Sequence, residues 1–179
     1  MQLLLALSRL IDCLNRWVGR TTVWLILCSV LISAGNAVVR KAFGVSSNAW
    51  LEAQWYLFAV IVLFGASQTL RLNGHVRVDL FYGQLTPRAQ VWLDLVCLAL
   101  FLMPASLLLT GMSWTVFAES WRIGEVSSNA GGLVRWPVKL VLPLGFGLLA
   151  LQGLAEMVRR AAMLSGAIPL SVQYERPLQ

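Results

Sequence analysis

The sequence predicts an all-α integral membrane protein in which four transmembrane helices follow an N-terminal amphipathic interfacial helix. Of the 179 residues, 58% are apolar and 12% are charged, and the mean hydropathy is +0.72. Soluble domains carry about 25% charged residues, so lipid must be part of the solvent. The apolar residues are gathered into four long stretches. Each stretch is expected to be a helix, because an open strand would leave backbone groups unpaired in lipid.

The first predicted element is an interfacial helix over residues 1–17. Apolar side chains recur at helical spacing in this segment at Leu3, Leu4, Leu7, Leu10, Ile11 and Leu14. Most of its polar residues fall elsewhere, at Ser8, Arg9, Asp12, Asn15 and Arg16. This pattern is typical of a helix that lies along a membrane surface before the first span. A frayed tail is the alternative interpretation.

The transmembrane domain is predicted to cover residues 18–160. Its four spans are expected at about residues 21–39, 51–70, 91–112 and 138–158. Each stretch has the roughly 20 predominantly apolar residues that a helix needs to cross about 30 Å of hydrocarbon. Pro104 and Pro143 fall inside the third and fourth spans, where we expect kinks. Residues 161–179 have no sustained periodicity and are expected to form a cytoplasmic tail.

Basic residues predict the orientation of the spans. With four spans, both termini and the loop between the second and third spans share one side of the membrane. That side holds nine of the 14 Lys and Arg residues, and the other side holds five. The positive-inside rule therefore places both termini in the cytoplasm. Tryptophans near both ends of the spans fit anchoring at headgroup depth: Trp17, Trp24, Trp50, Trp55, Trp92, Trp114, Trp121 and Trp136.

The sequence lacks the residues that catalysis or metal binding would need. His75 is the only histidine, so it cannot supply a His₂ or His₃ metal site or a pair of haem ligands. His75 and Asp79 have the spacing of a helical dyad, but no nucleophile of recognisable context lies near them. There is no P-loop, G-x-S-x-G or G-x-G-x-x-G motif, and the scattered basic residues form no face for nucleic acid. We predict neither an enzyme nor a bound cofactor.

No Asp, Glu, His, Lys or Arg lies near the middle of a predicted span. Glu52 and Asp94 are close to the starts of their spans, and Glu156 is close to the end of its span. Glu52 fits a first helical turn, where a carboxylate suits the helix dipole and reaches headgroup water. A self-contained transporter usually keeps an ionisable group near the midplane. The chain is therefore predicted to work as the partner of another membrane protein.

Small residues at helical spacing predict places where helices approach closely. The first span carries Ser29, Ser33 and Ala37, the second carries Gly65 and Thr69, and the fourth carries Gly147, Ala150 and Gly153. Chance placement on lipid-facing surfaces is the alternative for each set. Together they predict a bundle that packs internally and against another protein.

Three sequence stretches then resemble a known family. The second span runs into "NGHVRVD" at residues 73–79, the next loop carries "GGLVRWPVK" at 131–139, and the fourth span ends in "GLLALQGLAEMVRR". In combination they resemble the small (Q-type) membrane subunit of TRAP transporters, the tripartite ATP-independent periplasmic uptake systems, over residues 18–160. Ala130 departs from the family pattern, in which a proline is expected after Asn129.

The resemblance implies a small permease subunit in a bacterial inner membrane, working in secondary active transport. Its partners would be a large TRAP membrane subunit with a sodium-coupled, elevator-type transport path, a periplasmic solute-binding protein, and membrane lipids. The small subunit would brace the large one and help dock the binding protein. The solute implied is a small organic acid.

The resemblance also implies candidate contact residues. In the cytoplasmic loop, contacts with the large subunit are expected at Asn73, His75, Arg77 and Asp79. Arg77 and Asp79 are expected to pair with each other or with that subunit, so Asp79→Ala should lower the yield of the complex. Further large-subunit contacts are expected at Glu52, Trp55, Tyr56, Gly65 and Thr69. Docking of the binding protein is expected at Glu119, Arg122, Glu125, Asn129, Arg135 and Lys139.

One alternative function of a different class stays open at this point. Four spans also suit a self-sufficient small multidrug-type transporter that acts as a dimer. That function predicts an essential carboxylate within a span, at Glu52 or Asp94. A membrane enzyme or an assembly factor has no motif to support it.

Overall fold

The predicted all-helical membrane fold is confirmed. The computed structural model describes residues 2–45, 47–74 and 82–170, and every regular element in these ranges is a helix. Four helical segments are long and apolar enough to cross a membrane: Gln2–Phe43, Asn48–Arg71, Pro87–Arg122 and Trp136–Leu164. They correspond in order to the four predicted spans, and each is longer than predicted.

Helix α1 (Gln2–Phe43) corrects the prediction for the N-terminus. It is one continuous helix of 42 residues, so its first turns do not form a separate interfacial helix. In these turns the leucines face outward and the polar residues face the protein, since Leu10 is 68% exposed while Asn15 is fully buried. Ser8 and Asp12 are buried beside Asn15. The polar stripe therefore packs against protein while the leucines face outward, and the helix is apolar along its length rather than clearly amphipathic.

Helix α2 (Asn48–Arg71) ends at a turn formed by Asn73 and Gly74. The backbone amide of Leu72 donates to the Gln68 carbonyl at 3.0 Å, and that of Gly74 donates to the Thr69 carbonyl at 2.9 Å. Asn73 has φ of 56°, a left-handed conformation that asparagine tolerates better than most residues. These bonds satisfy the last carbonyls of the helix and end the second span. The rest of the motif, including His75, Arg77 and Asp79, lies outside the described residues.

The third span consists of α4 (Pro87–Cys97), the π-helical segment η1 (Leu98–Leu102) and α5 (Met103–Arg122). The Thr86 hydroxyl caps its start by accepting from the Ala89 amide at 3.4 Å. Pro104 has no N–H to donate to the carbonyl one turn earlier, and its ring crowds that carbonyl. The amide of Met103 instead donates to the carbonyl of Leu98, five residues back. The irregularity expected at Pro104 is thus a local π-helical turn.

Helix α6 (Trp136–Leu164) is the central helix and packs against α1, α2, α4 and α5. Two glycines allow close approach: a Cβ on Gly145 would lie 2.6 Å from Leu63 Cβ of α2, and one on Gly153 would lie 2.5 Å from Leu102 Cδ2. Gly65 and Gly147 belong to the predicted small-residue sets, yet a Cβ on either would meet no atom within 4 Å. Of these predicted small residues, Gly153 lies at a close helix contact within the chain, whereas Gly65 and Gly147 do not.

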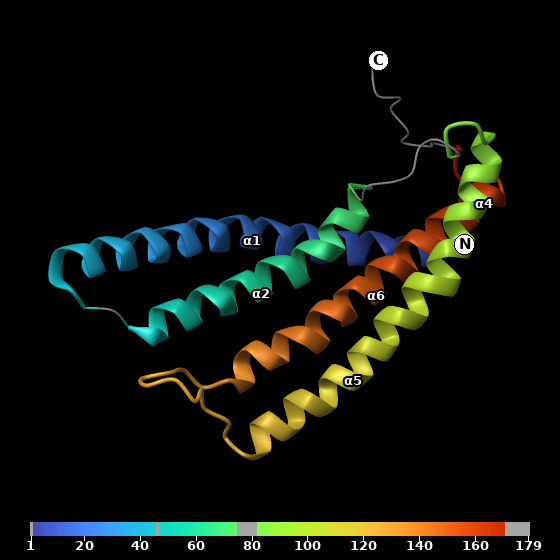
Figure 1. Cartoon of the computed structure of the whole chain (residues 1–179). Coiled ribbons are helices and arrows are strands. Elements are labelled where there is room, and N and C mark those ends of the chain that lie inside the picture. The colour runs from blue at the N-terminus through green and yellow to red at the C-terminus, as the bar shows by residue number, and fades with distance from the viewer. Residues whose placement is uncertain (1, 46, 75–81, 171–179) are drawn as a thin grey trace.

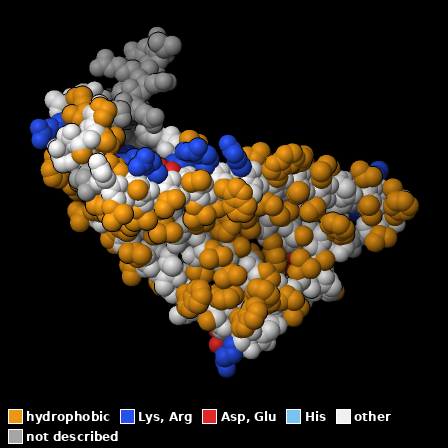
Figure 2. All heavy atoms as spheres, turned by 180° about the vertical axis from the view of Figure 1, so that it is seen from behind, with side chains coloured by type: hydrophobic (Ala, Val, Ile, Leu, Met, Phe, Trp, Pro, Cys, Tyr) orange, Lys and Arg blue, Asp and Glu red, His pale blue; other side chains and the backbone are white. Residues whose placement is uncertain are grey.

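The four spans have two distinct ends. Figure 1 shows α1, α2, α6 and α5 in that order across the view, with the loop between α5 and α6 at one end and the N-terminus and α4 at the other. We call these the loop end and the N-terminal end. On the face shown in Figure 2, hydrophobic side chains cover most of the surface, while Lys and Arg side chains lie along its upper edge and at its extremities. This distribution is that of helices with lipid-facing sides and polar ends.

Candidate functional site

The segment between α5 and α6 folds into a hairpin-like loop, and we call residues 125–135 the loop hairpin. The Arg135 amide donates to the Glu125 carbonyl at 2.8 Å, and the Ser127 amide donates to the Leu133 carbonyl at 2.9 Å. Val126 and Val134 form an isolated antiparallel bridge within it. Its backbone is therefore paired and ordered rather than an open loop.

Glycine is required at the tip of the loop hairpin. The Gly132 amide donates to the Asn129 carbonyl at 2.9 Å and closes the turn. Gly131 has φ of 69°, a left-handed conformation, and a Cβ on Gly132 would lie 2.5 Å from Ser127 Cβ. Ala130 stands where the family pattern leads us to expect proline, and the turn is closed with alanine at this position.

Glu52 binds the loop hairpin to α2. Its carboxylate accepts hydrogen bonds from the Ser127 hydroxyl, from Asn129 Nδ2 at 2.8 Å and from the Leu133 amide at 2.7 Å. Glu52 is only 3% exposed. The sequence placed this carboxylate in headgroup water, whereas in the structure three donors from the loop replace that water. A buried carboxylate with three donors is satisfied, and it fixes the loop to the helix.

Two further side chains on the same face of α2 hold the loop hairpin. Asn48 Nδ2 donates to the Ala130 carbonyl at 3.1 Å, and the Tyr56 hydroxyl donates to the Val134 carbonyl at 3.0 Å. Asn48, Glu52 and Tyr56 are four residues apart and so lie in a row along one helix face. The spacing of these three residues is the signal in the sequence that indicates their contact with the loop hairpin. The predicted site residues included Glu52 and Tyr56 but not Asn48.

Ion pairs attach the base of the loop hairpin to the start of α6. Glu125 pairs with Lys139, and Arg135 lies 3.7 Å from the same carboxylate. The hydrogen bond from Lys139 is the main reason that the pKa of Glu125 lies below its ordinary value. Glu119 and Arg122 form a separate pair at 2.7 Å, with 56% and 73% of their side chains exposed. An exposed pair adds little stability, so these two charges are available to a partner.

Aromatic rings form a cluster beside the loop hairpin. Trp121 and Trp136 meet edge to face, with ring centroids 4.4 Å apart, and Phe117 lies 6.2 Å from Trp121 and 5.5 Å from Trp114. The first contact therefore joins the end of α5 to the start of α6 at the base of the loop hairpin.

A second polar site lies at the N-terminal end, where Gln152 of α6 meets the polar stripe of α1. Asn15 Nδ2 donates to Gln152 Oε1 at 2.8 Å, while Gln152 Nε2 donates to Asp12 at 3.0 Å and to Glu156 at 3.2 Å. Asn15 and Gln152 are fully buried. The Gln152 amide gives the polar stripe of α1 a hydrogen-bonding partner inside the protein. This partner explains why the stripe faces inward.

Two arginines of α6 neutralise the carboxylates around this site. Arg159 pairs with Asp12 and Glu156, and Arg160 pairs with Glu156 and with Asp94 of α4 at 3.2 Å. Buried carboxylates need such partners, because an uncompensated charge in a low-dielectric interior is costly. We call these residues the α6 polar network: Asp12, Asn15, Asp94, Gln152, Glu156, Arg159 and Arg160.

Sequence reasoning did not predict the α6 polar network. Arg159 and Arg160 were counted there only among the basic residues that orient the spans. The available signal was spacing: Gln152, Glu156 and Arg159 or Arg160 recur along one face of a helix. A polar helix face that is buried requires polar partners from another helix, and Asp12 and Asn15 of α1 are those partners.

The remaining candidate contacts on α2 lie on an open surface or bond locally. Trp55 is 63% exposed. A Cβ on Gly65 would meet nothing within 4 Å, and Thr69 is half-buried, with its hydroxyl donating to the Gly65 carbonyl at 3.0 Å. Among residues 2–45, 47–74 and 82–170, no group of three or more His, Cys, Asp and Glu side chains is placed to hold a metal ion.

Comparison with known proteins gives one match. A family model described as "Tripartite ATP-independent periplasmic transporters, DctQ component" matches residues 29–163, which is more than half of the chain. The match covers the loop hairpin, Glu52 and the α6 members of the polar network. No curated protein and no solved structure matches the chain significantly. The chain therefore belongs to the DctQ component family of the tripartite ATP-independent periplasmic transporters, as one of their small membrane components.

Proposed function

We propose that this small permease subunit braces the large membrane subunit of a sodium-coupled TRAP transporter and helps the periplasmic solute-binding protein to dock. The observation that carries the proposal is the distribution of charge. Residues 21–39, 53–70, 95–118 and 140–155 contain no Asp, Glu, His, Lys or Arg. The carboxylates at the span ends bind the chain's own loop and helices. A path for ions or a charged solute needs polar groups near the midplane, whereas a brace does not.

The bracing surface proposed for α2 includes Trp55 and Gly65. Trp55 is 63% exposed, and a Cβ on Gly65 would meet nothing within 4 Å, so the small residue at position 65 lets a helix of the large subunit approach closely. Gly65→Leu should lower recovery of the large subunit in co-purification. Gly111→Leu on α5 is the matched control, because a Cβ at Gly111 also meets nothing within 4 Å. Equal recovery with both variants would exclude this α2 surface.

The docking surface proposed for the binding protein is the loop end, with both chain termini in the cytoplasm. The contacts from α2 make the loop hairpin a fixed platform, and Arg122 presents an exposed charge beside it. Rim charges mainly change association rates at low salt. Arg122→Glu should slow association of the binding protein by roughly 3–10-fold at low salt. Arg16→Glu, an exposed change at the N-terminal end, is the control and should leave the rate unchanged.

The solute proposed is a small organic acid, and its sodium coupling is assigned to the large subunit. Family membership and the absence of midplane charge in the described spans support this division of labour. The alternative, a self-sufficient multidrug-type dimer, needs a span carboxylate available to the cargo. Glu52 is occupied by three donors of the loop hairpin, and Asp94 is paired with Arg160. Both observations favour the subunit over the self-sufficient transporter.

A further inference from the structure

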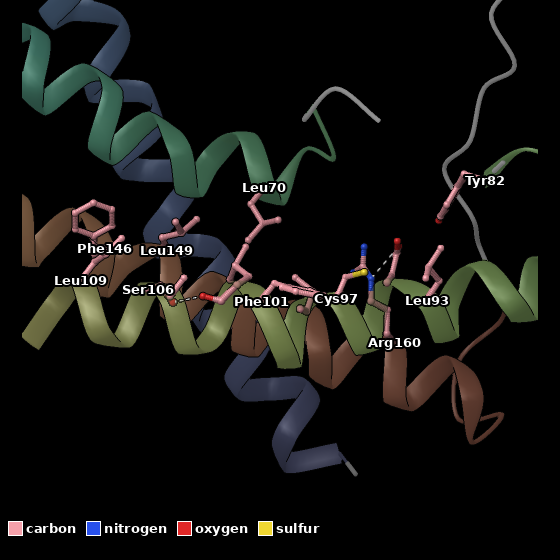
Figure 3. Close-up of a pocket in the computed structure, with 14 residues that line it drawn as sticks. Leu70, Tyr82, Leu93, Cys97, Phe101, Ser106, Leu109, Phe146, Leu149 and Arg160 are labelled. Carbon is pink, nitrogen blue, oxygen red and sulfur yellow. Dashed lines mark hydrogen bonds and ion pairs between the residues drawn. The ribbon is translucent and has the colours of Figure 1, made fainter. Parts of the chain in front are cut away.

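A long apolar groove remains open between α2 and the third span. Its volume is about 740 Å³, and its walls are the end of α2 and one side of α4, η1 and α5, with α6 as the floor. Figure 3 shows Phe146 and Leu109 at one end of this groove and Tyr82 and Arg160 at the other. The groove is thus apolar along most of its length and polar at one end.

The dimensions of the groove suit a hydrocarbon chain better than a protein helix. Leu93 and Leu109 both line it, and 16 helical residues span about 24 Å. A volume of about 740 Å³ over that length describes a long and narrow space, whereas an α-helix with side chains is about 10–12 Å in diameter. A helix could place only a row of side chains in the groove, whereas an acyl chain could lie along it.

At the polar end of the groove, Arg160 is paired with two carboxylates, Asp94 and Glu156. Arg160 Nε lies 3.2 Å from Asp94 Oδ2, and the two side chains are 14% and 18% exposed. Arg160 Nη1 bonds to Glu156, and within the described part of the chain Nη2 has no partner. A guanidinium with open N–H groups suits a phosphate, and the neighbouring carboxylate suits an ammonium group.

This polar end lies near helix ends, as a lipid headgroup requires. Asp94 is in the second turn of α4, and Arg160 is four residues from the end of α6. Leu70, at the end of α2, lines the same region. Charged side chains at this depth belong to the interface between hydrocarbon and water.

We propose that the groove binds one zwitterionic phospholipid of the phosphatidylethanolamine type. One acyl chain lies along α4, η1 and α5. The phosphate accepts from Arg160, and the ammonium group faces Asp94. The charges select this headgroup over an anionic one, because Arg160 is already paired with both Asp94 and Glu156 and leaves no net positive charge to attract an anion. The bound lipid fills the space that α2 and the third span leave between them.

The test measures lipid retained by the purified full chain. The protein is delipidated in detergent, titrated with phosphatidylethanolamine or phosphatidylglycerol, and examined by native mass spectrometry. Ala105 is exposed and lines the groove, so Ala105→Trp should lower phosphatidylethanolamine occupancy at least about tenfold. Ala118→Trp, at an exposed position of the same helix outside the groove, is the matched control and should change occupancy less than about twofold.

A headgroup variant tests the polar end separately. The native chain should prefer phosphatidylethanolamine over phosphatidylglycerol, and Asp94→Asn should remove that preference while still binding lipid. Equal retention of both lipids by the native chain, or unchanged occupancy in Ala105→Trp, would overturn the proposal. A cysteine at position 105 that cross-links to a helix of the large subunit in a complex without bound lipid would also overturn it, by identifying a protein occupant.

Discussion

The packing of α6 on α2 depends on the absence of a side chain at Gly145. A Cβ there would lie 2.6 Å from Leu63 Cβ and 3.3 Å from the Leu63 carbonyl carbon. Comfortable carbon–carbon contacts are about 3.5–4.0 Å, so Gly145→Ala must move the two helices apart by about 1 Å. Because one of the clashing atoms is backbone, side-chain rotation cannot remove the overlap.

The expected cost of this overlap is about 1–3 kcal/mol, the usual range for overpacking a tightly packed site. Alanine also favours a helix over glycine by up to about 1 kcal/mol, which partly offsets that cost. Gly147→Ala gains the same helix preference, and its Cβ meets nothing within 4 Å. The difference in unfolding free energy between the two variants therefore isolates the clash and should be about 1–3 kcal/mol.

The assay is reversible unfolding in mixed micelles of dodecyl maltoside and sodium dodecyl sulfate, followed by far-ultraviolet circular dichroism. Gly145→Ala should unfold at a lower fraction of dodecyl sulfate than the native chain. Gly147→Ala should unfold at the same fraction or a higher one. Equal midpoints for the two variants would refute the close crossing of α2 and α6 at Leu63.

Three further predictions concern the two polar sites. Glu52→Gln replaces an acceptor of three hydrogen bonds with a group that also donates, so amide exchange at Leu133 should rise roughly tenfold or more, while the exposed Glu119→Gln should not change it. The pKa of Glu125 is lowered mainly by its hydrogen bond from Lys139, so its contribution to stability is present above the ordinary carboxyl pKa of 4.5 and is lost as pH falls through the lower folded value. Fluorescence of a variant that retains only Trp136 should show this transition below pH 4.5, and Glu125→Gln should abolish it. Gln152→Leu should destabilise the chain by about 1–3 kcal/mol, since it leaves buried Asn15 and two carboxylates without the shared amide; Gln54→Leu, half-buried and without a hydrogen bond in the described structure, is the control.

Each of these predictions has a result that would contradict it. Unchanged exchange at Leu133 in Glu52→Gln would mean that the loop hairpin is held without the carboxylate. A fluorescence transition that persists in Glu125→Gln would assign it to another group. Equal unfolding free energies for Gln152→Leu and Gln54→Leu would mean that the amide at position 152 adds no net stability to the α6 polar network.

The sequence was sufficient to predict the spans, because the length and apolarity of a membrane helix are local properties. The turn at Asn73 and Gly74 and the irregularity at Pro104 were predictable for the same reason, since each follows from the backbone chemistry of one residue. The family resemblance rested on short motifs and agrees with the match over residues 29–163.

The pairing of polar groups could not be predicted, because it depends on which helix faces meet. The stripe of Ser8, Asp12 and Asn15 has the same periodicity whether it faces water or a polar neighbour. Only the position of Gln152 and Arg159 on α6 makes the inward orientation favourable. Glu52 presents the same difficulty, since its three donors come from a loop 75 to 81 residues later in the chain.

The central claim is that this chain supports transport without containing the transport path. The most direct measurement is sodium-dependent uptake of a small organic acid into proteoliposomes containing the large subunit, with the solute-binding protein outside. The three components together should give uptake, and this chain with the binding protein alone should give none. Omission of this chain should reduce uptake strongly. Full uptake by the large subunit and binding protein without this chain would contradict the account, as would uptake by this chain without the large subunit.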